Sequence, residues 1–75
     1  MFSTDHITQA LAASGRAQAL DAWREAANLV STRWRLFLAA ESEGRQWAFA
    51  SYVVALDAEA AAAAELAALA PPIAA

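Results

Sequence analysis

The sequence predicts an all-α protein in which a short N-terminal helix is followed by a long antiparallel helical hairpin. Alanine supplies 24 of the 75 residues, whereas glycine and proline supply two each, and this composition favours helices. Apolar residues recur every three or four positions in the two longest stretches, which is the helical period. The two glycines divide the chain, so we expect one domain over residues 1–70 with helices at about 4–13, 16–41 and 45–70. A C-terminal tail over residues 71–75 begins with the two prolines, which end the last helix.

The first predicted helix is short. Ser3 or Thr4 can cap its N-terminus, and Asp5 would lie near the positive end of the helix dipole. Ser14 and Gly15 predict its end, because glycine readily adopts the left-handed conformation that terminates many helices. We therefore expect residues 4–13 to form a helix separate from the one that follows.

The central helix carries two neighbouring apolar stripes. One follows steps of three and four residues and consists of Leu20, Trp23, Ala27, Val30, Trp34, Phe37 and Leu38. The second consists of Leu29, Leu36 and Ala40. At about 100° per residue the two stripes cover an arc of about 200°, which is wider than one packing partner normally covers. We therefore expect this helix to pack against two neighbours.

A tight turn at residues 42–44 would fold the two long helices into an antiparallel hairpin. Facing residue numbers would then add to about 88, which sets Trp34 near Val54 and lets Arg33 reach Asp57. Opposite charges that meet in this register favour the hairpin, although such surface pairs contribute only about 0–1 kcal/mol each. One continuous rod is the alternative, since a single glycine costs only about 1 kcal/mol inside a helix.

The size of the chain indicates self-association. A chain of 75 residues buries only about 60 % of its unfolded surface and needs additional stabilisation. Without cysteine and with one histidine, disulfides and the common metal sites are excluded, which leaves oligomerisation. We expect two hairpins to form a four-helix-type bundle as a homodimer or a higher assembly. The residues assigned to the core or to self-association are Leu20, Trp23, Val30, Trp34, Phe37, Leu38 and Val54.

Contacts with another protein form a second set of candidates. Trp47 lies beside the predicted turn, and tryptophan is enriched at binding hot spots. Arg33 and Arg35 bracket Trp34, a pattern that can bind a nucleic-acid strand or an acidic partner, although pairing with acids of the third helix or simple solvation is the favoured interpretation. The full set of candidate partner contacts is Leu29, Leu36, Trp47, Tyr52, Arg33 and Arg35.

No pattern in the sequence predicts catalysis. The carboxylate pairs Glu41/Glu43 and Asp57/Glu59 are spaced by two residues, which places the members of each pair on different helix faces. His6 has no second histidine or cysteine with which to bind a metal. We therefore predict a protein that is not an enzyme and has no catalytic residues, no cofactor and no metal.

The charge distribution bears on partners and location. The net charge is −3, and no basic cluster exceeds Arg33-Trp34-Arg35, which argues against nonspecific binding to nucleic acid or to an anionic membrane. No run approaches 18 uncharged apolar residues, and the N-terminus lacks the pattern of a signal peptide. We expect a cytoplasmic protein.

Two functions are consistent with these features. The first is a non-enzymatic helical interaction module: a small homo-oligomeric adaptor, or a regulatory, assembly or accessory protein. Its abundant alanine and exclusive use of arginine as the basic residue suggest a GC-rich genome and a bacterial or phage source. The alternative is a small DNA-binding regulator, because residues 7–23 have the short helix, glycine turn and longer helix of a helix-turn-helix. That alternative predicts that Arg16, Arg24 and Arg35 converge on one exposed face.

Overall fold

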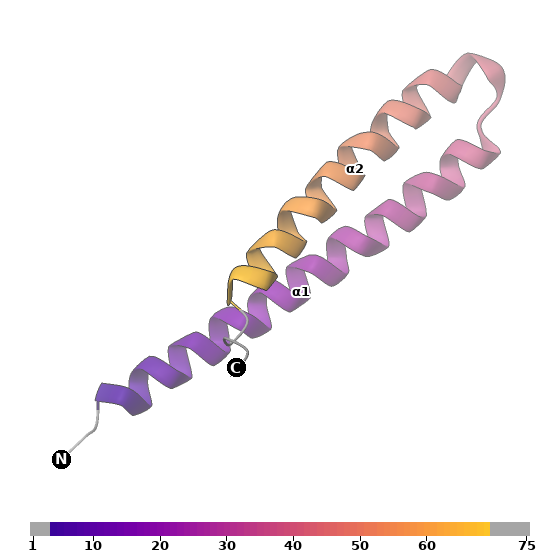
Figure 1. The fold of residues 1–75 in the computed structure, drawn as a ribbon. Coiled ribbons are helices and arrows are strands. Elements are labelled where there is room, and N and C mark those ends of the chain that lie inside the picture. The colour runs from indigo at the N-terminus through magenta and orange to yellow at the C-terminus, as the bar shows by residue number, and fades with distance from the viewer. Residues whose placement is uncertain (1–3, 70–75) are drawn as a thin grey trace, which may run out of the picture.

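The protein is a hairpin of two long helices. A computed structural model describes residues 4–69, and describes side chains from residue 7 onward. Helix α1 spans Thr4–Ala39 and helix α2 spans Ser42–Leu69, and the two run antiparallel (Figure 1). The all-α class and the helical hairpin are therefore confirmed. The predicted cap at Ser3, the side chain of His6 and the tail over 71–75 lie outside the described residues.

The predicted break at Ser14 and Gly15 is wrong. Helix α1 continues through both residues, and no described residue has a positive φ angle. The surrounding alanine, leucine, glutamine and arginine are good helix formers, and together they offset the roughly 1 kcal/mol that one glycine costs. The residues assigned to a short first helix are therefore the first turns of α1, and the described chain has two helices where three were expected.

The turn comes earlier than expected. Only Ala40 and Glu41 separate the helices, so the first long helix ends at residue 39 instead of 41 and the second begins at 42 instead of 45. The Ala40 N–H donates to the Phe37 carbonyl oxygen at 3.2 Å, and the Gly44 N–H donates to the Glu41 carbonyl oxygen at 2.9 Å. Gly44 thus belongs to the first turn of α2, where the nearby Glu43 carboxylate interacts favourably with the helix dipole.

Ring contacts between the helices fix their register. Phe37 and Phe49 have centroids 5.5 Å apart, and Trp34 and Tyr52 have centroids 5.0 Å apart. Both pairs of residue numbers add to 86, close to the expected 88. Because of the small offset, Trp34 faces Tyr52 and not Val54.

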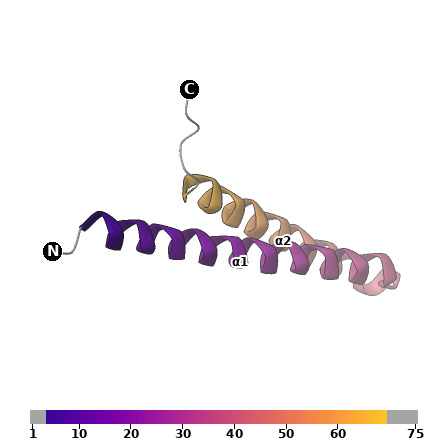
Figure 2. The ribbon, with the colours of Figure 1, turned by 90° about the horizontal axis from the view of Figure 1, so that it is seen from below.

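The two arms of the hairpin differ in length. Helix α1 has 36 residues and α2 has 28. In the observed register the end of α2 at Leu69 is level with residue 17 of α1, so residues 4–16 extend past α2. Figures 1 and 2 show this segment projecting alone at the N-terminal end, and Figure 2 shows α2 inclined away from α1 towards its own C-terminal end. We call residues 4–16 the arm.

The hairpin is too thin to enclose a core. Its extents are 66 × 27 × 13 Å and its radius of gyration is 18.0 Å, whereas a compact chain of this length has a radius of about 11 Å. Among the side chains that the structure describes, only Ala55 is buried, with 1 % of its surface exposed. The helices therefore cover each other along one seam and leave their other sides open.

Candidate interaction surface

The described residues show neither a metal-ligand cluster nor a pocket. No group of three or more histidine, cysteine or acidic side chains within residues 7–69 could hold a metal ion, and no pocket is found over the same part of the chain. Neither α1 nor α2 is long and apolar enough to cross a bilayer, as far as the described residues go. The candidate site is therefore an apolar surface.

Four aromatic rings join the helices near the turn. Besides the two pairs that fix the register, Trp34 stacks against Phe37 at 5.5 Å, and Phe49 lies 6.3 Å from Tyr52. Aromatic pairs at such distances contribute about 0.5–1.5 kcal/mol each beyond the burial of their area. Trp34 and Phe49 nevertheless stay 41 % and 49 % exposed, so the cluster is only partly covered by the hairpin itself.

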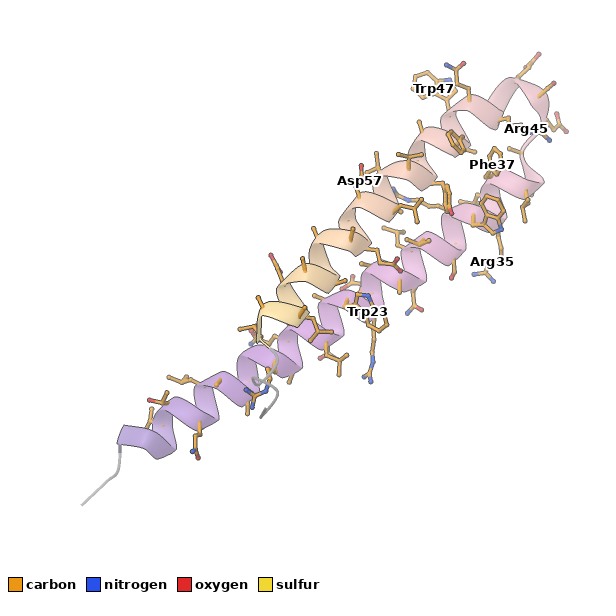
Figure 3. All side chains as sticks on the ribbon, viewed as in Figure 1. Trp23, Arg35, Phe37, Arg45, Trp47 and Asp57 are labelled. Carbon is orange, nitrogen blue, oxygen red and sulfur yellow. The ribbon has the colours of Figure 1, made fainter. Side chains whose placement is uncertain are left out.

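The arginines do not form the predicted patch. Arg33 points into the seam and donates a hydrogen bond from Nη1 to the Ser51 carbonyl oxygen at 3.0 Å. Its expected pairing with Asp57 is wrong, since Asp57 projects from α2 away from α1 (Figure 3). Arg35 is exposed and points away from α2. Arg33 and Arg35 therefore lie on different sides of α1 and cannot both bind the same ligand.

Arg45 is a contact that the sequence interpretation missed. Its guanidinium carbon lies 6.0 Å from the centroid of the Phe37 ring, a distance at which cation–π attraction is weak but favourable. Figure 3 shows both side chains at the turn end of the hairpin. The early turn at residues 40–41 brings them together, and nothing in the sequence except the nearby glycine marks the position of that turn.

The residues predicted for the core or for self-association separate into two groups. Leu20, Trp23, Val30 and Phe37 are half-buried and lie along the seam. Trp34, Leu38 and Val54 are exposed, the last two by 60 % and 61 %. The seam thus uses the middle of the wide apolar arc of α1 and leaves exposed apolar side chains at both edges of the arc.

The candidate partner contacts likewise fall into two groups, half-buried and exposed. Tyr52 and Arg33 are half-buried in the seam, where each contacts the opposite helix. Leu29, Leu36, Trp47 and Arg35 are exposed, and Trp47, which points away from α1 in Figure 3, is 80 % exposed.

Apart from Leu69 at the end of α2, the exposed large apolar side chains of the described residues lie on two opposite faces of the hairpin. On α1, Leu29 and Leu36 are rotated by about 110° from the seam residues, at 100° per residue. On α2, Trp47 and Val54 are rotated by about 110° in the same sense. Because the helices are antiparallel, equal rotations bring both pairs to the same side. We call this side the leucine face, and it consists of Ile7, Leu11, Leu29, Leu36, Trp47 and Val54.

The exposed apolar residues on the opposite side of the hairpin extend over a shorter length. Trp34 and Leu38 of α1 and Phe49 and Val53 of α2 are rotated from the seam in the opposite sense, and we call them the aromatic face. The sequence interpretation did not include Ile7, Leu11, Phe49 or Val53 in its site. Ile7 and Leu11 join the row of Leu29 and Leu36 only when α1 is continuous, so the predicted break at Gly15 concealed them.

Comparison with known proteins adds no relative. No protein-family model, no curated protein and no solved structure matches the chain.

Proposed function

We propose that this protein is a non-enzymatic helical interaction module that associates with itself through its leucine face and acts as a small adaptor, or as a regulatory, assembly or accessory protein. The observation that carries the proposal is the exposure of apolar side chains. Within the described chain, eleven large hydrophobic residues are at least 38 % exposed, while Ala55 alone is buried. Such an extended apolar surface is typical of a protein that has a binding partner.

The amount of exposed surface is consistent with one further protein chain as the partner. The accessible surface is 6149 Å², whereas a compact monomer of this mass exposes about 4,400 Å². The difference of about 1,700 Å² exceeds the roughly 800 Å² that each partner buries in a standard protein–protein interface. A second hairpin is a suitable partner, because two such helical layers form a four-helix-type bundle with the apolar side chains inside.

The leucine face is favoured over the aromatic face because its residues have fewer partners within the hairpin. Trp34 and Phe49 of the aromatic face already stack on Phe37 and Tyr52. No ring contact of this kind involves Trp47, which is more exposed than either Trp34 or Phe49. The leucine face also extends along the arm, whereas the aromatic face is confined to the half of the hairpin near the turn.

The DNA-binding alternative loses the observation on which it depended. A helix-turn-helix needs a turn after the short helix, and α1 passes through Gly15 without one. The net charge of −3 also disfavours approach to a polyanion. The cytoplasmic location and the bacterial or phage source stay predictions.

A double variant tests the proposal. Leu29→Glu with Leu36→Glu places two charges on the leucine face while the seam, which neither residue joins, is left intact. We expect the mass from light scattering to fall to that of one chain, 7.9 kDa, with helical circular dichroism retained. The matched control is Asn28→Glu with Ala39→Glu, which adds the same two charges to exposed positions on the outer side of α1 and should leave the assembly intact. An assembly that persists in the leucine-face variant would exclude this face as the interface.

A further inference from the structure

The arm is the part of the hairpin with the least contact to the rest of the chain. Ile7 and Leu11 are 58 % and 68 % exposed, and α2 ends before it reaches them. The arm cannot fold back onto its own hairpin, because α1 is one helix from Thr4 to Ala39. At 1.5 Å per residue, the middle of the arm lies about 40 Å from Leu36. No other segment within residues 4–69 is therefore placed to cover it.

The leucine face has large apolar side chains at both ends and small or polar ones between them. The exposed apolar groups lie on the arm and near the turn. Between these groups, the same row of α1 carries Gln18, Ala22 and Glu25. Such a distribution is self-complementary when two copies lie antiparallel, since the arm of each copy then meets the turn end of the other.

The two ends of this row of α1 can pair in an antiparallel arrangement, although Leu11 and Leu29 are then level with Thr32 and Ser14. If Ile7 of one copy is level with Leu36 of the other, the numbers of any two level residues add to 43. Gln18 of one copy is then level with Glu25 of the other. The two Ala22 side chains then lie beside the symmetry axis, where small residues permit close approach of the helices. A parallel arrangement sets Glu25 against Glu25 instead, and like charges at such an interface are unfavourable.

The register of the hairpin also shows which residue of α2 is level with the arm of the second copy. Val54 is level with residue 32 of its own α1, because facing numbers add to 86. Residue 32 is in turn level with residue 11 of the second copy. Leu11 of one chain therefore reaches the side of the hairpin where Val54 and Leu36 of the other are exposed.

We propose that two copies associate antiparallel and that the arm of each packs in trans on the leucine face of the other, with Ile7 and Leu11 against Leu36 and Val54. This inference rests on the proposed self-association and specifies its geometry. Each end of the dimer is then a bundle of three helices: the two helices of one hairpin near its turn and the arm of the other copy.

Cross-linking tests the geometry directly, because the chain contains no cysteine. Leu11→Cys and Val54→Cys are prepared as separate proteins, mixed, exchanged and treated with a short bismaleimide. We expect cross-linked dimers in the mixture and essentially none in either protein alone. In the proposed arrangement two Leu11 positions, or two Val54 positions, lie about 30 Å apart along the dimer.

The mass of each untreated sample, measured in parallel, distinguishes this inference from the proposed function. A dimeric mass with Leu11→Cys linked to itself would show that the arms lie side by side, and would overturn the antiparallel geometry. A dimeric mass with no cross-link in the mixture would also overturn it. A monomeric mass for the unsubstituted protein would overturn the proposed self-association itself.

A second pair of variants tests the arm without cysteine. Ile7→Glu with Leu11→Glu should weaken dimerisation by about a hundredfold or more, because two apolar anchors are lost at each of two contacts. Gln9→Glu with Ala13→Glu adds the same charges at the same spacing to the opposite side of the arm, and should leave the dissociation constant nearly unchanged. Equal effects of the two pairs would contradict a specific contact by Ile7 and Leu11.

Discussion

Replacing Gly15 by alanine tests whether α1 is one helix. In the structure this residue is helical, has no positive φ, and a Cβ atom added to it meets nothing within 4 Å. Alanine would therefore fit without strain. It would also remove the entropic cost of glycine in a helix interior.

The expected gain is about 1 kcal/mol per chain, the difference between glycine and alanine in a helix interior. A gain of that size raises the melting temperature of a domain of this length by about 4–8 °C. Urea unfolding followed by circular dichroism at a fixed protein concentration measures both the change in free energy and the change in helix content.

Gly44→Ala is the matched control. Gly44 is also helical with open space around its Cβ position, but it lies in the first turn of α2, where helix propensity counts for less. We expect a smaller gain there. If Gly15 instead ends a short helix in the left-handed conformation, alanine would destabilise the protein by about 1 kcal/mol or more, and a loss of stability would refute the continuous helix together with the arm.

Three further substitutions probe the seam. Ala55→Leu should destabilise the hairpin by about 1–3 kcal/mol because it overpacks the one buried position, whereas Ala58→Leu, at an exposed site, should have little effect in urea unfolding. Arg33→Met should cost about 1–3 kcal/mol through loss of the charged hydrogen bond to the Ser51 carbonyl. Arg35→Met is the control, because Arg35 does not make that bond. Equal losses of stability in the two variants would contradict the contact between Arg33 and Ser51. Phe37→Leu removes a ring that contacts two others and should cost about 1–3 kcal/mol, measured by thermal unfolding; an unchanged melting temperature would show that the ring cluster does not stabilise the hairpin.

The class of fold could be predicted from the sequence because it depends on local properties. An alanine-rich chain with few helix breakers and helical apolar spacing must form helices, and a polar segment with a glycine near residue 44 suggested where they reverse. The break at Gly15 could not be judged in the same way. One glycine is a weak signal, and its effect depends on whether the flanking residues sustain the helix.

The identity of the seam depends on the partner helix and could not be read from α1 alone. Its apolar arc is wide enough for two neighbours, so the pattern does not say which part of the arc α2 covers. Much of the C-terminal half of α2 is alanine, which gives little information about register. The ring pairs Phe37–Phe49 and Trp34–Tyr52 set the register instead, and in this register Leu38 and part of Trp34 are exposed on the aromatic face.

Sedimentation equilibrium of the unsubstituted protein, from low to high micromolar concentration, measures whether the hairpin associates with itself. We expect a mass of twice 7.9 kDa at the higher concentrations, with dissociation to the single chain on dilution. A single chain of 7.9 kDa that keeps its full helix content over the whole range would contradict it, because the leucine face would then be stable in water without a second copy.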